Sequence, residues 1–317
     1  MATFKIFKLT FTSPLHLSRG KMNTYESSDI TLHSDTLKSA IYVAALQLDM
    51  KLWADDFMEN MTISSAFPFD AKGCYLPMPL SYYPEVKTDE RKAFKSVKFL
   101  TIKQFEAIAK GETTDVLDAE RKANQPKIWE RDTTQRVKIN LEGDSEPFYV
   151  EKLYPEKGSG LYFMAQSESV DFTKLRAALR LLQDNGIGLQ KGLGNGQFTF
   201  EEETLQIDLA SNANAWLNLS LYRPIASELT DTMLKKSSYQ FKKRGGWIAS
   251  PAQEDNISLR KKAVLMFTEG SVFSFENIDN QAIVKGKVEN IKPDTNQIEH
   301  PIWRDGKAIF LPITIAK

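Results

Sequence analysis

A glycine-rich stretch near the middle of the chain is the part of the sequence best suited to binding chemistry. Residues 185–200 read Asn-Gly-Ile-Gly-Leu-Gln-Lys-Gly-Leu-Gly-Asn-Gly-Gln-Phe-Thr-Phe. The stretch holds five glycines: Gly186, Gly188, Gly192, Gly194 and Gly196. Glycines open positive-φ conformations and let a ligand approach bare main-chain amides. A plain connection with Gly186 as a helix cap stays the alternative, although a cap needs only one glycine.

The elements expected around this stretch exclude the familiar phosphate loops. Residues 172–182 carry apolar side chains at helical spacing, with Asp171 as the N-cap, and residues 198–200 read as a strand. A dinucleotide-binding fingerprint needs a strand, then glycines, then a helix, and Lys191 stands where its third glycine belongs. A P-loop needs Gly-Lys followed by Ser or Thr, which is missing here. We therefore expect a helix, a glycine loop and a strand.

Residue types that support catalysis or metal binding are sparse. The three histidines, His16, His33 and His300, lack the spacing of metal ligands, and there is one cysteine, Cys74. No paired acidic motif suggests a divalent metal. His33 and Ser34 lack a third orienting group for nucleophilic catalysis. We expect no catalytic residue, no metal and no cofactor.

The composition is that of a soluble globular protein. The 317 residues are 42% hydrophobic and 26% charged, and they allow two domains. No apolar run suggests a membrane span, and the first residues, strand-like from Phe4, leave no room for a signal peptide. A single cysteine suits a cytoplasmic location. The 41 basic residues equal the 41 acidic ones, so any nucleic-acid surface must be a local basic track, as expected inside a larger assembly.

The first 203 residues predict one domain with the element order β-α-(β, long insertion, β)-α-β, which is a ferredoxin-like order. Residues 4–11 read as a strand, residues 15–21 as a basic connection, and a helix capped by Ser34 should run to about Trp53. Two features stand out in an insertion of about residues 54–160: a short helix through residues 102–108, and a hairpin of residues 128–141 and 147–150. A strand at residues 161–163 then leads to the glycine loop.

The second half, residues 204–317, predicts a further β-α-β-β series. Leu217, Leu219 and Leu221 alternate as a half-buried strand, and Pro224 begins a helix that reaches Met233. Strands follow at residues 239–248, 264–271, 283–284 and 309–311, and no second amphipathic helix is visible. In Arg244-Gly245-Gly246-Trp247 a cation, two permissive residues and an aromatic ring are adjacent, which suits RNA contacts; a β-bulge with a half-buried Trp is equally compatible.

These segments together resemble the RAMP superfamily of CRISPR RNA-binding proteins. Within it, the chain resembles the fourth subunit of the type III-A (Csm) effector complex, which holds the 5′ tag of the guide RNA. The resemblance covers nearly the whole chain. The glycine loop carries it, together with these segments: residues 33–37, 95–105, 221–224, 244–247, 267–271 and 300–306.

The resemblance implies an α+β fold of two ferredoxin-like domains in tandem. The first would span residues 1–203, with the insertion, a β-hairpin thumb and the glycine loop at residues 186–196. The second, modified domain would span residues 204–317. The first sheet would offer one face to RNA, as in other readers of single strands.

The function implied is that of a non-catalytic RNA-binding scaffold in antiviral defence. It would cap the 5′ tag, dock the large subunit that carries a cyclic-oligonucleotide synthase, and contact the backbone subunit and the target RNA near the tag boundary. A helix N-terminus at His33 and a basic thumb that includes Lys138 fit phosphate contacts. The expected RNA-binding residues are His16, Ser18, Arg19, Lys21, His33, Ser34, Asp35, Lys38, Arg131, Arg136, Gly188, Lys191, Gly192, Leu193, Gly194, Asn195, Gly196, Arg244, Gly245, Gly246 and Trp247.

Two other functions stay open. Some RAMP proteins cleave precursor guide RNA without a metal, using His or Tyr as acid or base, and His16 and His33 would be the candidates in this chain. A protein-only assembly element with a vestigial RNA site is the other. A precursor-cleavage assay distinguishes the nuclease from the RNA-binding scaffold. RNA crosslinking to the glycine loop distinguishes the scaffold from the protein-only assembly element.

Overall fold

The chain forms a mixed α+β structure. The computed structural model describes residues 1–18, 25–82, 87–117, 125–139, 144–248, 259–275, 281–295 and 298–315. Arg19 and Lys21, two expected RNA contacts, lie outside these residues. Among the helices described, none is long and apolar enough to cross a membrane.

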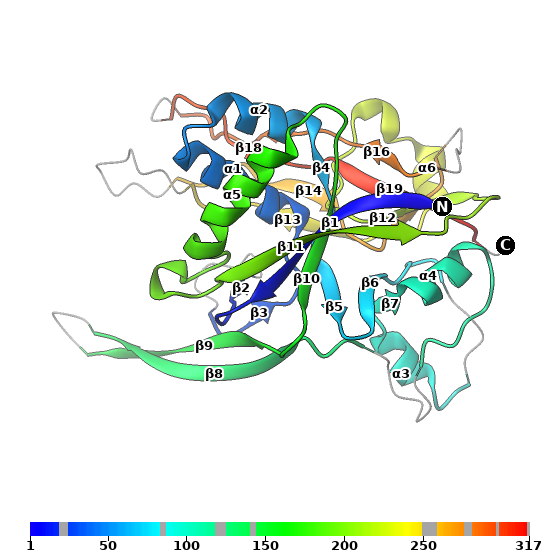
Figure 1. Ribbon diagram of the computed structural model, residues 1–317, viewed down its shortest axis with the longest axis horizontal. Coiled ribbons are helices and arrows are strands. Elements are labelled where there is room, and N and C mark those ends of the chain that lie inside the picture. The colour runs from blue at the N-terminus through cyan, green and yellow to red at the C-terminus, as the bar shows by residue number, and fades with distance from the viewer. Residues whose placement is uncertain are drawn as a thin grey trace.

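A large antiparallel sheet forms the centre of the first half (Figure 1). Its strands lie in the order β11-β1-β10-β5-β6-β7, and β4 pairs with β10. Two of its neighbours, helices α1 (Ser34–Gln47) and α5 (Phe172–Asn185), pack against each other. The strands are β1 (Ala2–Phe11), β4 (Thr62–Ile63), β5 (Phe67–Asp70), β6 (Gly73–Pro77), β7 (Phe99–Thr101), β10 (Gly160–Gln166) and β11 (Phe198–Ile207). The chain order β1-α1-β5-β10-α5-β11 with this strand order is that of a ferredoxin-like unit.

The sheet of the first half is buried on both faces. Along β1 the side chains alternate: Phe7 and Leu9 join a core with α1, α2 (Lys51–Asn60) and α5, whereas Phe4 and Ile6 point to the other face. That other face packs against α4 (Ile102–Ala109) and against strands of the second half. The expectation that this face is offered to RNA is therefore wrong, because the second half of the chain covers it.

The second half is a smaller sheet with the order β15-β12-β19-β16. Its far face buries a cluster of aromatic rings around Trp216 and Tyr222, to which Met233 of α6 (Asp231–Lys235) contributes. A two-stranded hairpin adjoins it through a bridge between Tyr222 and Phe267. A ferredoxin-like second half stays a prediction. The strands are β12 (Ala215–Asn218), β13 (Phe241–Arg244), β14 (Val264–Phe267), β15 (Val272–Phe273), β16 (Ile283–Lys285) and β19 (Ala308–Ile313).

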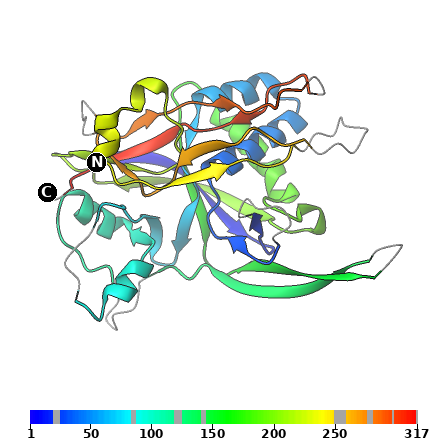
Figure 2. The ribbon, with the colours of Figure 1, turned by 180° about the vertical axis from the view of Figure 1, so that it is seen from behind.

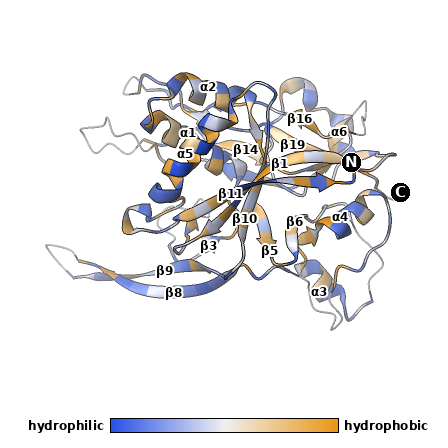
Figure 3. Cartoon of the chain, in the orientation of Figure 1, coloured by the Kyte–Doolittle hydropathy of each residue, from blue (hydrophilic) through white to orange (hydrophobic). Residues whose placement is uncertain are grey.

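The long hairpin of the insertion projects from the body, as expected for a thumb. Its strands β8 (Trp129–Lys138) and β9 (Glu146–Pro155) pair along their whole lengths. Figure 1 shows the hairpin reaching away from both sheets, and Figure 3 shows β8 as largely hydrophilic. The remaining short elements are β2 (Leu17–Ser18), β3 (Ser28–Asp29), α3 (Arg91–Ser96), β17 (Glu289–Asn290), β18 (Trp303–Arg304) and the 3-10 turns η1 (Lys191–Leu193) and η2 (Ala226–Glu228).

Several expected element boundaries differ from those observed. The first helix, α1, ends at Gln47, because Asp49 has a φ of 56°, which a right-handed helix does not allow. Helix α2 then begins at Lys51. The expected helix after Pro224 is only η2 followed by the short α6. Strand β12 is buried along its whole length and stops at Asn218, so the half-buried alternation was wrong.

Domain limits also shift in the structure. Strand β11 continues to Ile207, where it pairs with Ala2, so the first sheet extends past the expected boundary at residue 203. Strand β5 is a central strand and lies inside the range assigned to the insertion. Strand β6 also belongs to the sheet, so the insertion first leaves the sheet after Pro77.

Candidate nucleic-acid interface

The glycine loop joins α5 to β11, as the sequence predicts. The side chain of Asp171 caps the start of α5 by accepting from the Thr173 amide at 2.7 Å, and Gly186 ends the helix with a φ of 75°. The base of the loop is closed by the Ile187 amide, which donates to the Gly196 carbonyl at 2.9 Å. The helix and strand thus hold both ends of the loop rigidly.

The five glycines divide into two groups. A Cβ atom on Gly186, Gly188 or Gly196 would lie 2.4, 2.5 or 1.9 Å from a backbone oxygen, so these three are needed for close packing. Gly192 and Gly194 have nothing within 4 Å of a Cβ position. Only these two glycines leave room for a ligand to approach the backbone.

The tip of the loop is its exposed part. Lys191, Gly192 and Gly194 are exposed, and Leu193 keeps 65% of its surface in contact with solvent. Asn195, by contrast, is 4% exposed, and its side-chain amide donates to the main-chain carbonyl of Gln190 at 3.3 Å. Of the RNA contacts expected in this loop, those at the tip, residues 191–194, reach solvent. Gly188, Asn195 and Gly196 instead make the close contacts that hold the loop together.

The connection after β1 binds the glycine loop to the thumb. The His16 carbonyl accepts from the Leu189 amide at 2.9 Å, and Pro14 accepts from Gly196 at 2.8 Å. On the other side Leu15 and Leu153 of β9 exchange two backbone bonds of 2.8 Å. Segments far apart in the sequence therefore meet at one edge of the molecule.

His16 supports this junction from inside. Its side chain is 1% exposed, and Nδ1 lies 2.6 Å from the carbonyl oxygen of Glu151, to which it donates. Its Nε2 has no partner among the described residues. Burial contradicts the expectation that His16 contacts RNA directly, whereas Ser18, on β2, is exposed.

The thumb carries part of the expected charge. Arg131 is 45% exposed and lies 3.3 Å from the Glu151 carboxylate, which also accepts from the Ser28 amide at 2.6 Å. Lys138 is exposed near the tip, and Arg136 is half-buried. Sequence reasoning missed Glu151, because no local motif marks a carboxylate that joins β8, β9 and β3.

The start of α1 is not an RNA surface. Its N-cap is His33, and no side chain caps it; Ser34, which we expected as the cap, accepts from the Leu221 amide at 2.9 Å. Ser34, Asp35 and Lys38 are 0% exposed. These three expected contacts are corrected: their side chains join the first half of the chain to the second.

Asp35 is the centre of that junction. Arg244 donates to both of its carboxylate oxygens at 2.9 Å, and Arg304 donates to Oδ2. Burial alone would raise the pKa of Asp35, but the two guanidinium groups hold it well below its usual range. Arg244 is thus used inside the protein, which corrects its assignment as an RNA contact.

His33 belongs to a second buried ion-pair group. Its Nδ1 lies 2.8 Å from Glu269, and its Nε2 lies 3.8 Å from Asp29, which Lys242 also contacts at 2.8 Å. Burial would lower the pKa of His33, but the Glu269 carboxylate outweighs it and raises the pKa to about 9. At 7% exposure and in ion pairs, His33 has no open position for contact with RNA or for acid–base catalysis.

Lys38 is a structural lysine. Its ammonium group donates to the carbonyls of Met58 and Met61 at 2.8 and 2.6 Å and to Asp305 at 3.1 Å. Burial lowers the pKa of Lys38 and raises that of Asp305. The sequence showed Arg304-Asp305 only as part of a family-like segment, and gave no sign that its partners lie in α1.

The Arg-Gly-Gly-Trp segment forms a bulge in the β13–β14 hairpin. Regular pairing stops at Arg244 and Val264 and resumes as a bridge between Trp247 and Arg260. The Arg260 guanidinium lies 4.7 Å from the centre of the half-buried Trp247 ring. Gly246, with a φ of 128°, provides the irregular backbone. The bulge is the arrangement observed, and RNA contact by Gly245, Gly246 and Trp247 stays a prediction.

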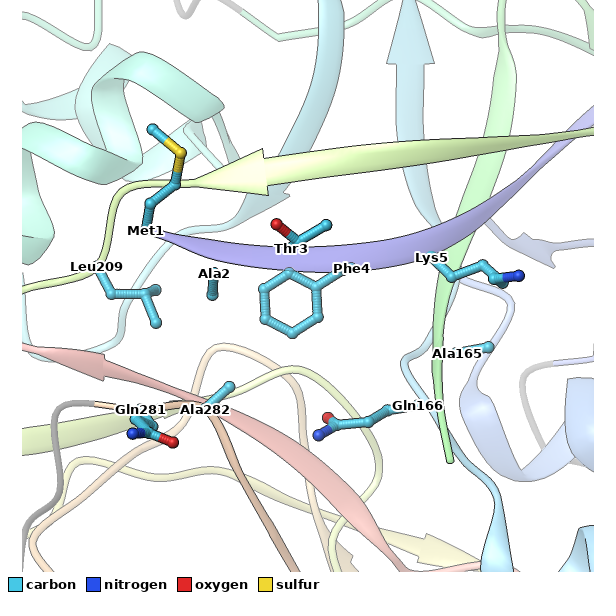
Figure 4. A pocket seen from close by; sticks show the side chains of 10 residues that line it. All are labelled: Met1, Ala2, Thr3, Phe4, Lys5, Ala165, Gln166, Leu209, Gln281 and Ala282. Atoms are coloured by element: carbon cyan, nitrogen blue, oxygen red, sulfur yellow. The ribbon is translucent and has the colours of Figure 1, made fainter. Parts of the chain in front are cut away.

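A hollow between the two sheets is lined by residues that do not suggest a binding or catalytic site. Figure 4 shows its lining, which includes the first residues of β1 together with Gln166, Leu209 and Gln281. Its volume is about 460 Å³. The one charged side chain in the lining, Lys5, pairs with Glu202 at 2.7 Å. Within the described residues, no group of three or more His, Cys, Asp or Glu could hold a metal ion.

The chain is similar to known proteins of one kind. A model of the CRISPR Csm4 C-terminal domain matches residues 211–313. Over 292 residues the chain is 25% identical to the CRISPR system Cms protein Csm4 of Mycobacterium tuberculosis (strain CDC 1551 / Oshkosh), covering 91% of this chain and 92% of that protein. The chain is thus similar to Csm4 proteins over most of its length. Csm4 of Thermococcus onnurineus (strain NA1) is 28% identical over 227 residues, 67% of this chain and 76% of that protein.

Solved Csm4-containing structures share the fold over the whole chain. A chain of the crystal structure of a Csm1-Csm4 cassette in complex with cA4 has a TM-score of 0.66 at 21% identity, with 100% of both chains covered. A chain of the Csm3-Csm4 subcomplex of the type III-A CRISPR-Cas interference complex has a TM-score of 0.63 at 17% identity, covering 99% of this chain and 100% of that one. The resemblance to a Csm subunit and the mixed α+β class are confirmed.

Proposed function

We propose that the chain is the non-catalytic subunit that caps the 5′ tag of the guide RNA in a type III-A complex. One observation carries this proposal: the glycine loop, whose tip is exposed, is joined through its base to the connection after β1, and that connection is joined to β9 of the thumb. Lys191 provides a cation there, and Gly192 leaves the backbone open. A strand of phosphates fits such a combination of exposed amides and local charge.

The proposed partners are the large synthase-bearing subunit, the backbone subunit, and target RNA near the tag boundary. Among the solved structures that the chain resembles, Csm4 is paired with Csm1 in one assembly and with Csm3 in another. The projecting hairpin supports a role at the tag boundary, because its strands extend well beyond the sheets (Figure 2). A nuclease role is disfavoured because His16 and His33 are 1% and 7% exposed.

Gly192→Val is expected to weaken binding of tag RNA about tenfold, or about 1.4 kcal/mol. The added side chain would occupy the open space at the loop tip, and no neighbour within 4 Å strains the fold. Fluorescence anisotropy with a labelled tag RNA at fixed salt measures the change. Unchanged affinity would contradict backbone binding at the tip.

Thermal unfolding of the same variant is the control, and it should match the parent protein. Lys191→Gln provides a second test. Loss of one phosphate contact should reduce the slope of the logarithm of affinity against the logarithm of salt concentration by about one. Gly194→Val is less suitable, since a φ of 76° strains any side chain there.

The large subunit is expected to raise affinity for tag RNA at least tenfold. A chain with equal numbers of acidic and basic residues neutralises few phosphates alone, so its counterion-release contribution is small. Sites on two joined chains act at high effective concentration. Size-exclusion chromatography of the pair, followed by RNA titration, measures association and affinity. Separate elution, or tight salt-resistant binding by this chain alone, would contradict the proposed place in the complex.

A further inference from the structure

The β13–β14 hairpin exposes apolar side chains on one face. Phe241 pairs with Phe267, and Lys243 pairs with Leu265, so these four side chains share that face. Phe241 is 61% exposed and Leu265 is 52% exposed. Tyr239, which precedes β13, is 37% exposed and stands edge-on to Phe267 with the ring centres 5.1 Å apart. Figure 2 shows the hairpin, in yellow and orange, at the front of that view.

The two strands of this hairpin and the residues next to them are rich in basic side chains. Residues 235–248 hold five Lys or Arg side chains, residues 259–268 hold three, and neither range holds an Asp or Glu. The chain as a whole is neutral, so this is a local basic excess. Lys242 and Arg244 lie on the opposite face and are used in ion pairs with Asp29 and Asp35. Lys243 is exposed on the apolar face and has no ion pair among the described residues.

The hairpin is joined to the candidate RNA interface. Lys242 donates to Asp29 of β3 at 2.8 Å, and β3 pairs with β2, which directly follows His16. The His16 carbonyl in turn holds the glycine loop. Strands β3 and β2 therefore connect the hairpin to the segment that holds the glycine loop.

We propose that the exposed face of β13–β14 is a stacking platform for unpaired RNA bases. Phe241 would provide the central ring, Tyr239 and Leu265 would flank it, and Lys243 would contact a phosphate. An exposed aromatic ring beside basic side chains is a common means of holding single strands without sequence readout. The inference rests on the proposed function and assigns base contacts to residues outside the glycine loop.

Phe241→Ala in the full chain tests the platform. With a labelled oligouridylate of about ten nucleotides, the affinity should fall about five- to tenfold, because a stacked base is lost. Phe241→Trp should retain affinity, and its added indole fluorescence should be quenched by the RNA. The matched control is Val284→Ala, an apolar side chain that is 40% exposed on β16, which should bind normally.

Salt dependence separates stacking from charge. Phe241→Ala should leave the slope of affinity against salt unchanged, whereas Lys243→Gln should reduce it by about one unit. Normal RNA affinity of Phe241→Ala overturns the platform. If that variant also co-purifies poorly with the large or backbone subunit, the face is a protein-docking surface instead.

The two proposals fail in different ways. If Gly192→Val loses RNA and Phe241→Ala does not, the platform is wrong and the tag-binding proposal stands. If the parent chain neither binds nor crosslinks RNA, alone or with the large subunit, both are wrong.

Discussion

Asp35→Ala is expected to lower the free energy of unfolding by about 3–5 kcal/mol, because it leaves buried cations without a counter-charge. Asp35 is fully buried, and the side chains of Arg244 and Arg304 are only 12% and 8% exposed. Both arginines belong to the second half of the chain, so the loss should fall on the contact between the halves. Urea denaturation followed by circular dichroism measures it.

The control for Asp35 is an exposed Asp–Lys ion pair. Asp294 contacts Lys262 at 2.6 Å, and the two side chains are 92% and 50% exposed. Asp294→Ala should cost less than about 1 kcal/mol, because water screens the pair. Equal effects of the two substitutions would show that the buried junction contributes no more than a surface pair.

Gly196→Ala is expected to destabilise the chain by about 3 kcal/mol and to reduce RNA binding more than tenfold. Its Cβ atom would lie 1.9 Å from the Ile187 carbonyl oxygen, at a φ of 76°. Relief of that clash must open the hydrogen bonds that hold the loop against Pro14 and His16. Thermal unfolding and anisotropy with tag RNA measure the two effects.

Gly158→Ala separates steric clash from backbone strain. Gly158 has a φ of 75°, nearly the same as Gly196, but nothing lies within 4 Å of its Cβ position. The substitution should therefore cost only the left-handed strain, about 1 kcal/mol, and should leave RNA binding unchanged. If Gly158→Ala and Gly196→Ala behaved alike, close packing at the loop base would not be the reason for glycine there.

Much of the local structure was predictable from the sequence because its signals are local. The cap at Asp171, the helical spacing through Leu182 and the glycine at residue 186 together place α5 and its end. The thumb was predictable for the same reason, as two β-favouring stretches flank a polar turn. Each of these signals operates within a few residues.

Side-chain roles at the start of α1 were not predictable in this way. The sequence shows Asp35 as a first-turn acidic residue, which is favourable at any helix N-terminus. Its partners lie 209 and 269 residues away, so nothing local indicates that the carboxylate is buried. The same holds for Lys38 with Asp305, separated by 267 residues. From the sequence alone, a charged residue that contacts RNA cannot be distinguished from one that forms a buried ion pair.

The sequence by itself determined the glycine loop with its flanking helix and strand, the thumb hairpin, and the family resemblance. Only the tertiary structure decided which residues reach solvent. Packing of the two sheets buried the face we expected to bind RNA. Close backbone contacts within the loop, and between the loop and His16, made three of the five glycines structural. The physical reason is that propensity and periodicity act between neighbours along the chain, whereas burial and charge pairing depend on segments that only the folded chain brings together.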